Sequence, residues 1–451
     1  MARRGKKGTT ALDDLLRKRW QELPETVRTP QQLAGVGGVA CGATWGVMER
    51  CNFACTSCYL SDAANRTRPL PFPEVKAQLD ALRKHLGPGG KAQITSGEVT
   101  LLDKHELGRI VAYARKIGLD PMVMTNGERF LQDRDYLPTL VRDYGLRKVS
   151  FHIDTTQRGR NGMRMNRRLR ERDIHWIRER FTTLVRDVRS QTGHRLHAAQ
   201  TVTVTNHNVE DVADIVAWTL DNLDGFRLLS FLPVAEVGRT KDIRLGDGTP
   251  ALDGIWRRIC AGIGRPLNRD AMHFGHRSCN ITVPVLVLST GDRHHVVEVA
   301  REDRPWDLRV VRRLLRELGL RIDLDDGWLL NGWRALVTLL GRPGLFAELG
   351  AYSFYRLWGA RRELGAAALS LLRLRRLRLR PLLLVVHSFM SPDELETPVG
   401  QERLKACVFK LPVNGRMVSM CEMNATGLRK QLNLQQLNGR RVGRSTASRT
   451  A

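Results

Sequence analysis

Short apolar runs alternate with stretches of helical periodicity between residues 43 and 235. Apolar residues recur at helical spacing in 73–85, 105–117, 136–144, 172–190 and 209–222. Strand-like runs begin near residue 43 and continue at 91–95, 121–127, 148–154, 195–205 and 226–235. Alternation with short connections implies parallel strands joined by right-handed crossovers. We therefore expect an α/β fold, a partial (β/α)6 TIM-like barrel with a C-terminal helical and hairpin extension.

The pattern changes on both sides of this repeat. The expected organisation is a basic leader over 1–40 with one helix at 11–22, the barrel over 41–240, a substrate or auxiliary-cluster region over 241–428, and a disordered basic tail over 429–451. Within the third region we expect a helix at 253–264, a buried strand at 281–288, helical structure over 306–380, and a hairpin that turns at Asn414-Gly415. An amphipathic membrane helix at 371–380 is disfavoured, because its Leu and Arg residues mix on the helical wheel.

The composition of the chain indicates in which compartment the protein works and what kind of partner it binds. With 42% hydrophobic residues, the 451-residue chain can build a core, and its net charge of +26 fits nucleic acid or an anionic membrane surface. Arginine-rich coding bias is the plain alternative. The N-terminus lacks an apolar secretory segment, and no apolar run is long enough to span a bilayer. We expect a cytoplasmic protein, with peripheral membrane contact as an option, whose eight cysteines serve metal or redox chemistry.

Three cysteines follow the first apolar run at the spacing Cys51-x3-Cys55-x2-Cys58. One loop can fold three thiolates around a soft metal centre, and a [4Fe–4S] cluster held at three irons leaves the fourth iron open. A zinc site is the alternative, but structural zinc normally has four protein ligands, and the sequence offers no second short-spaced Cys or His pair.

Together with Ser96-Gly97-Glu98 after the second strand, this triplet resembles the radical S-adenosylmethionine (SAM) superfamily, whose signature is CX3CXΦC followed by a GGE-like motif. One departure is Ser57, where the family usually has an aromatic residue or His. The resemblance implies a [4Fe–4S] cluster on Cys51, Cys55 and Cys58, a SAM cofactor, and a reductant such as a flavodoxin or ferredoxin.

Polar residues at the ends of the later strands are candidate SAM contacts. Low side-chain bulk at Ser96 and Gly97 would let backbone carbonyls approach the SAM ammonium, and Glu98 adds a negative charge and is the candidate catalytic residue. The further cofactor-binding candidates are Thr125, Asn126, Ser150, His152, Asp154 and, more weakly, Gln200. Alternation places Ser150, His152 and Asp154 on one face and Phe151 and Ile153 on the other. Each polar residue could equally be a buried group satisfied by its neighbours.

Two further groups carry charge or sulfur. Arg158, Arg160, Arg164, Arg167 and Arg168 follow the fourth strand and could grip an anion or form a solvated loop. Cys260 is expected to be a core residue. Cys407 and Cys421 flank the hairpin, and with Cys279, and Cys41 as fourth ligand, they could hold a second iron–sulfur cluster; isolated buried thiols are the alternative.

The C-terminal segment from His387 to Asn424 loosely resembles radical SAM enzymes of the tetraether lipid synthase and methanopterin-type methylase subgroup. This resemblance implies carbon-centred radical chemistry, C–C bond formation or methylation, on a lipid-like or pterin-like substrate. A radical SAM enzyme that modifies RNA or a peptide remains an alternative, with nucleic acid the less favoured partner. A non-catalytic iron–sulfur or zinc protein that binds nucleic acid is the alternative from another class.

Overall fold

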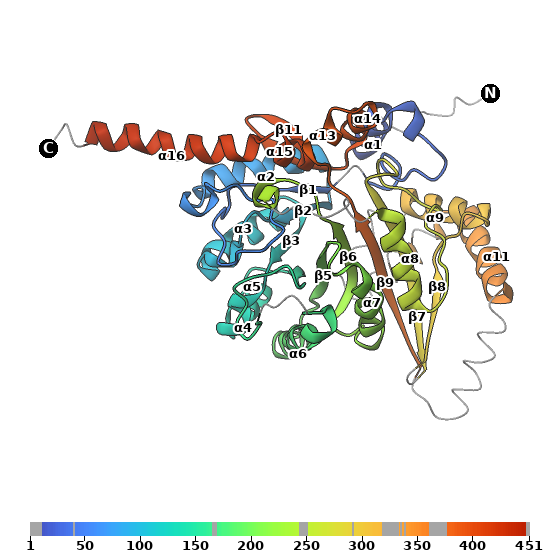
Figure 1. Cartoon of the computed structure of the whole chain (residues 1–451). Coiled ribbons are helices and arrows are strands. Elements are labelled where there is room, and N and C mark those ends of the chain that lie inside the picture. The colour runs from blue at the N-terminus through green and yellow to red at the C-terminus, as the bar shows by residue number, and fades with distance from the viewer. Residues whose placement is uncertain are drawn as a thin grey trace, which may run out of the picture.

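One sheet of eleven strands organises the chain, as the computed structural model shows (Figure 1). The structure describes residues 11–38, 41–164, 169–242, 251–290, 293–317, 333, 336–337, 340–359 and 377–447. The strand order is β11-β10-β1-β2-β3-β4-β5-β6-β9-β7-β8. The sheet curls into a half-barrel, so the predicted partial barrel with a C-terminal extension is confirmed.

The centre of the sheet is the predicted parallel repeat. Its strands are β1 (Cys41–Ala43), β2 (Gly90–Ile94), β3 (Leu119–Thr125), β4 (Lys148–His152), β5 (His197–Val204) and β6 (Phe226–Pro233). Each pairs in parallel with the next in chain order. Parallel strands of this kind place all their carboxyl ends at one rim, where loops can converge.

Helices cover the outer face of these strands. They are α2 (Phe72–Leu86), α3 (Lys104–Lys116), α4 (Glu128–Gln132), α5 (Tyr136–Arg142), α6 (His175–Thr192), α7 (Val212–Asp221) and α8 (Leu252–Ile263). Helix α3 begins where Asp103 accepts a hydrogen bond from the His105 N–H at 2.8 Å, and α6 ends at Gly193 with a φ of 69°. Both ends are therefore encoded locally.

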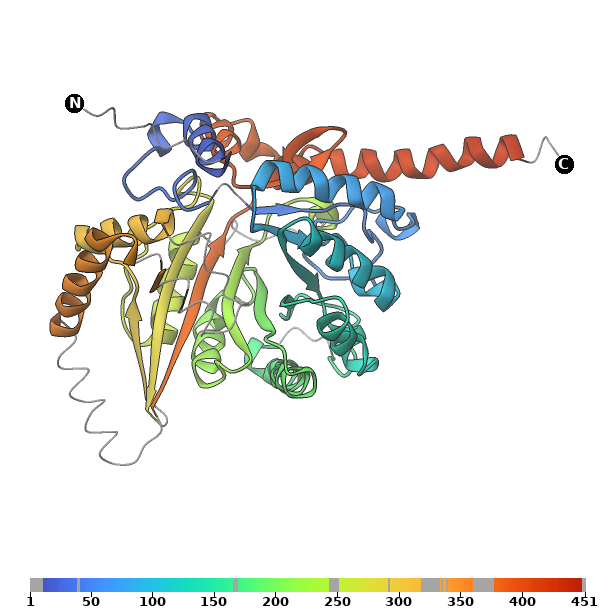
Figure 2. The ribbon, with the colours of Figure 1, turned by 180° about the vertical axis from the view of Figure 1, so that it is seen from behind.

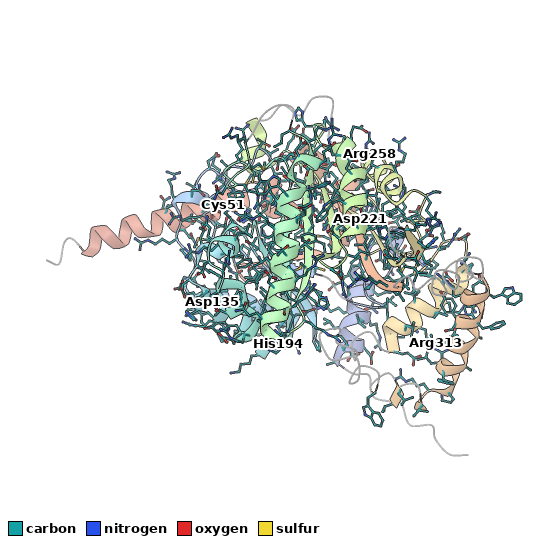
Figure 3. The ribbon with its side chains drawn as sticks, turned by 90° about the horizontal axis from the view of Figure 1, so that it is seen from below. Cys51, Asp135, His194, Asp221, Arg258 and Arg313 are labelled. Atoms are coloured by element: carbon teal, nitrogen blue, oxygen red, sulfur yellow. The ribbon has the colours of Figure 1, made fainter. Side chains whose placement is uncertain are left out.

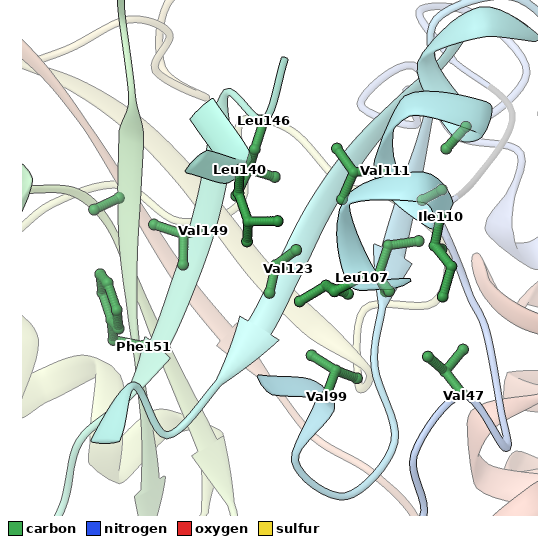
Figure 4. Packing of buried hydrophobic residues seen from close by; sticks show 14 of the residues in the cluster. Val47, Val99, Leu107, Ile110, Val111, Val123, Leu140, Leu146, Val149 and Phe151 are labelled. Atoms are coloured by element: carbon green, nitrogen blue, oxygen red, sulfur yellow. The ribbon is translucent and has the colours of Figure 1, made fainter. Parts of the chain in front are cut away.

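The apolar core lies between this helical layer and the sheet. Val123, Val149 and Phe151 point from β3 and β4 toward Leu107 and Leu140 on the helices (Figure 4). The Phe151 ring stacks on Phe181 of α6 with centroids 4.4 Å apart. Alternation leaves the opposite, concave face of the sheet less covered, because Gln93, Met122, Met124, His152 and Ser230 on that face are only half-buried.

The extension adds strands at both edges of the sheet. Beyond β6 lie β9 (Leu377–His387), β7 (Asn280–Thr290) and β8 (Arg293–Glu298), followed outward by α9 (Pro305–Glu317) and α11 (Pro343–Gly359). The strand predicted at 281–288 is confirmed. The prediction of helix over 306–380 is wrong for 377–380, because these residues pair antiparallel with 287–290 of β7. Residues 318–332 and 360–376 of that prediction lie outside the described residues.

At the other edge, β10 (Phe409–Val413) pairs with β1, and β11 (Arg416–Ser419) forms the predicted hairpin. Asn414 and Gly415 have φ values of 47° and 80°, as a two-residue turn between twisted strands requires. Short helices α13 (Pro392–Leu395), α14 (Pro398–Ala406) and α15 (Met420–Ala425) flank this hairpin.

The two chain ends both pack on this edge. Helix α1 (Ala11–Glu22) confirms the predicted N-terminal helix and lies beside α14 (Figures 1 and 2). The buried Arg19 donates from its Nη2 to the carbonyl oxygens of Ala406 and Cys407 at 3.2 and 2.7 Å. The predicted disorder from residue 429 is wrong, because α16 runs over Leu428–Ala447 and its first turns are buried. No helix among the described residues has the length and apolar character to cross a membrane.

Candidate metal and cofactor site

The cysteine loop lies at the carboxyl-end rim of the half-barrel, directly after β1 (Figure 3 labels Cys51). The loop after β4 holds one side, since Ala54 N–H donates to the Arg158 carbonyl and Thr56 N–H to the Thr156 carbonyl, both at 2.9 Å. The segment after β6 holds the other, with Cys58 N–H donating to Thr240 Oγ1 at 2.8 Å. Two loops from different strands therefore fix the path of the cysteine loop.

The Ser96-Gly97-Glu98 motif packs against the approach to this loop. Gly97 N–H donates to the Met48 carbonyl and Glu98 N–H to the Arg50 carbonyl, each at 2.8 Å. A Cβ on Gly97 would lie 2.3 Å from the Glu49 carbonyl oxygen and 2.4 Å from that of Arg50. Only glycine fits this backbone approach, so the motif braces the cysteine loop in addition to any role toward a cofactor.

Glu98 joins the ends of β2 and β3. Its buried carboxylate accepts hydrogen bonds from Thr100 N and Oγ1 at 3.0 and 2.6 Å, from Thr125 Oγ1 at 2.6 Å and from Asn126 N at 2.7 Å. Asn126 Nδ2 in turn donates to Asn52 Oδ1 at 2.9 Å, beside Cys51. The structure therefore brings together the predicted Glu98, Thr125 and Asn126, although Glu98 already accepts four hydrogen bonds from the protein.

Ser150, His152 and Asp154 share one face of the fourth strand and its extension, opposite Phe151, as alternation predicts. Ser150 Oγ lies 2.9 Å from Thr201 Oγ1, and His152 Nε2 lies 2.6 Å from Asp154 Oδ2. Burial opposes ionisation of Asp154, but His152, the Thr156 hydroxyl and the Thr203 N–H hold its pKa below the usual value. His152 is 31% exposed on its side chain, so this polar cluster reaches the concave face.

Gln200 does not join this cluster. It pairs in register with Phe151, whose ring packs on α6, so it lies on the helix-facing side of β5 together with Val202. Its amide is fully buried and has no hydrogen-bond partner among the described residues. The side-chain period of two turns Gln200 away from the concave face, so it lies apart from the other predicted SAM contacts on β4.

Arg160 is buried and bonds to other parts of the protein, so its guanidinium is not open to an anion. Its Nη2 donates to the carbonyls of Asn126 and His152 at 2.8 and 3.1 Å, and its Nη1 lies 3.4 Å from Glu128. Burial lowers the pKa of Arg160 to about 10. Of the other arginines in that prediction, Arg158 and Arg164 are exposed, and Arg167 and Arg168 lie outside the described residues.

The three thiols of the loop suit a positively charged metal centre. Burial raises the pKa of Cys51 to about 12 and raises those of Cys55 and Cys58, and the neighbouring thiols raise that of Cys55 further. Iron would supply the charge that lets these thiols ionise. Among the described residues, no three His, Cys, Asp or Glu side chains are already arranged around one point as a metal site would need, and this applies to iron and zinc alike.

A buried ion pair that the sequence analysis missed supports the loop from the C-terminus. Arg429 of α16 bonds to Glu49, which also accepts from Gly46 N–H at 3.0 Å, and its guanidinium lies 4.8 Å from the centre of the Tyr59 ring. Burial alone would raise the pKa of Glu49, but Arg429 and the Gly46 N–H lower it below its usual value. No sequence signal links positions this far apart.

A second group of thiols lies beside the hairpin. Cys279, Cys407 and Cys421 line one small pocket together with His276 and His387. Burial raises the pKa of all three thiols, that of Cys421 to about 12, and lowers that of His387 to about 4. Cys41, the fourth residue of the predicted set, is not among the lining residues.

Arg403 joins this pocket, with its Nε 3.4 Å from Cys279 Sγ. It also donates to the Ser388 carbonyl at 3.2 Å. The remaining cysteine, Cys260, packs against the core around α7 and α8, as predicted.

Comparisons with known proteins agree with the motif. Residues 45–219 match the family model of the radical SAM superfamily. A 211-residue stretch is 24% identical to 7,8-dihydro-6-hydroxymethylpterin dimethyltransferase of Methanocaldococcus jannaschii, and covers 45% of this chain and 38% of that protein. The chain therefore spans well under half the length of this relative.

Solved structures of similar fold are more distant. SuiB of Streptococcus suis bound to S-adenosylmethionine is 15% identical, with 44% of this chain and 42% of SuiB covered and a TM-score of 0.32. Methylornithine synthase is 12% identical, with 58% and 72% covered and a TM-score of 0.32. The match to the radical SAM family model over residues 45–219 therefore covers the cysteine loop, the Ser96-Gly97-Glu98 motif and strands β2 to β5.

Proposed function

We propose that this chain is a radical SAM enzyme that starts carbon-centred radical chemistry, C–C bond formation or methylation. The observation that carries the proposal is the loop of Cys51, Cys55 and Cys58, fixed at the rim by two other loops and lying within the matched domain. When bound, the cluster supplies the electron that breaks a C–S bond of the SAM sulfonium, which releases methionine and a 5′-deoxyadenosyl radical that abstracts hydrogen from carbon.

The residues of the chain would hold and orient these groups. Cys51, Cys55 and Cys58 would ligate three irons, while Ser96 to Glu98 fix the loop from below. The half-buried His152, which lies 2.6 Å from the buried Asp154, supports a role for this side of β4 in binding the polar parts of SAM. The electron would come from an external reductant such as a flavodoxin or ferredoxin.

Cysteine substitution tests this assignment. Cys55→Ala should abolish both the visible absorption of the reconstituted cluster and the dithionite-dependent release of 5′-deoxyadenosine. Cys260→Ala is the matched control, because Cys260 packs in the core around α8 and should leave both readouts intact. A Cys55→Ala protein that still forms 5′-deoxyadenosine would refute the proposal.

The substrate is proposed as a lipid-like or pterin-like molecule. The similarity to a pterin dimethyltransferase supports methylation and a pterin-like substrate. The exposed Phe346, Phe354 and Trp358 on α11 support contact with a lipid-like molecule or a membrane surface. Comparison of the lipid and pterin pools of a deletion strain and wild type tests this choice. Tight co-purification of RNA with unchanged small-molecule pools would favour the RNA-modifying alternative, for which the charge of +26 is the motive.

We also propose that Cys279, Cys407 and Cys421 hold a second iron–sulfur cluster in the pocket that His276 and His387 also line. Their support is the shared pocket, to which the hairpin brings Cys407 and Cys421. A Cys279→Ser/Cys407→Ser/Cys421→Ser protein should lose about half of the iron and sulfide of the wild type. Equal iron content in the two proteins would reject the second cluster.

A further inference from the structure

A groove lined by arginines lies apart from the cysteine loop. It has a volume of about 590 Å³ and runs between residues 30–31 and α9. Arg313 of α9 and Cys51 lie on different sides of the molecule (Figure 3). The volume is in the range of pockets that bind small molecules, so the groove is a candidate second binding site.

Positive charge dominates the lining of this groove. Its arginines are Arg301, Arg309, Arg312, Arg313 and Arg316, against two acidic residues, Glu302 and Glu317. The Glu317 carboxylate already has partners, since it lies 3.2 Å from Arg313 Nε and also pairs with Arg342. The acidic residues therefore leave much of the charge in the groove uncompensated.

The arginines of the groove differ in whether a carboxylate already pairs with them. Arg301 pairs with Asp303 at 2.8 Å, and Arg313 pairs with Glu317 and Glu348. Arg309 and Arg316 are exposed, and no carboxylate among the described residues pairs with either. The free guanidinium groups are thus on one face of α9, at positions spaced by about two helical turns.

Arg312 lies between Arg309 and Arg316 along α9, and its side chain is held in place by hydrogen bonds. Its Nη1 donates to the carbonyls of Pro30 and Gln32, the latter at 3.1 Å, and its guanidinium lies 5.8 Å from the centre of the Trp20 ring. Both hydrogen-bond partners are neutral, so they orient Arg312 without cancelling its charge. Burial and the neighbouring Arg316 lower the pKa of Arg312, as expected for cations held close together without an anion.

We propose that this groove binds a phosphate-bearing anion through Arg309, Arg312 and Arg316. Guanidinium groups match phosphate oxygens in geometry and charge, and phosphate binding would relieve the repulsion among the three cations. The phosphate could belong to a free small molecule or to a lipid head group, and the two sources present the same chemistry to the groove. The inference does not depend on the radical chemistry proposed above.

Binding measurements on the full chain test the site, with inorganic pyrophosphate in one arm. The other arm uses phosphatidylcholine vesicles with and without phosphatidic acid. Arg309→Gln/Arg316→Gln should weaken binding about tenfold or more, because the variant loses two charge-assisted contacts to the phosphate.

The matched control removes the same charge from a groove of balanced charge. Arg134 and Arg180 line a cavity of about 770 Å³ beside α6 together with Glu179 and Asp187. Arg134→Gln/Arg180→Gln should leave the affinity unchanged. Binding of pyrophosphate alone would identify a free ligand, and binding of phosphatidic acid vesicles alone would identify a lipid. Failure of the wild type to bind either probe, or an equal loss in both double variants, would overturn the proposal.

Discussion

Arg429 Nη1 donates hydrogen bonds of 2.9 and 3.1 Å to Oε1 and Oε2 of Glu49, so the C-terminal helix is tied to the residues that lead into the cysteine loop. Both side chains are buried, with 4% and 0% of their surfaces exposed. Asn433, one turn later, donates to Ser61 Oγ at 2.9 Å on the far side of the same loop. The C-terminal helix therefore holds the segments before and after the cysteine loop.

Removal of one partner of this pair should be costly. Arg429→Met leaves Glu49 buried and unpaired, and we expect the free energy of unfolding to fall by about 3–5 kcal/mol in denaturant titrations of the apoprotein. Iron incorporation should fall with it, because the loop loses its support. The double variant Glu49→Gln/Arg429→Met removes both charges and should recover part of the loss; a double variant as unstable as the sum of the single variants would contradict coupling.

Gly97 should tolerate no side chain. Gly97→Ala places a Cβ against the carbonyl oxygens of Glu49 and Arg50, which are backbone atoms and cannot turn away. We expect both a lower unfolding temperature and incomplete cluster reconstitution, measured by iron content. Gly350→Ala in α11 is the control, since nothing lies within 4 Å of the added Cβ, and alanine favours a helix by about 1 kcal/mol.

Acid stability should depend on Asp120 at the opposite rim. Burial disfavours the charged form, but Lys91 and Lys148 lower the pKa of Asp120 below its usual value. A depressed folded-state pKa stabilises the protein at pH values above the unfolded pKa of about 3.9, and that stability is lost as the pH falls through the folded pKa.

Asp120→Asn should therefore lower stability by about 1–2 kcal/mol at neutral pH, and flatten the dependence of stability on pH below about 4. Denaturant midpoints measured across acidic pH check this. An unchanged acid slope in the variant would show that other carboxylates dominate.

The sequence predicted the elements that local patterns encode. The alternation of Ser150 and His152 with Phe151 assigned the two faces of β4 correctly, and Asn414-Gly415 marked the hairpin because a primed turn needs positive φ values. The same alternation places Gln200 beside Phe151, and applying it across paired strands would have excluded Gln200 from the concave face.

The errors arose where distant contacts decide the structure. A basic, polar tail from Arg429 has the composition of a disordered segment, and its order depends on Glu49, which lies at the other end of the sequence. Arg160 was expected at a mouth open to anions, but its guanidinium donates to the carbonyls of Asn126, after β3, and of His152, at the end of β4. The contacts with Glu49 and with Asn126 join positions that are far apart in sequence.

The last prediction concerns Glu98, which accepts hydrogen bonds from neighbouring residues and is also a candidate SAM contact. Glu98→Gln replaces an acceptor with an amide nitrogen that must face donors from Thr100, Thr125 or Asn126. We expect the apoprotein to lose about 1–3 kcal/mol of unfolding free energy, measured without SAM, because one of these buried donors loses its acceptor. Glu106→Gln on the exposed face of α3 is the control and should be neutral. If the Glu98→Gln apoprotein instead has wild-type stability but binds SAM more weakly, Glu98 acts on the cofactor alone. A role in SAM binding would not affect stability measured without SAM, whereas a structural role would.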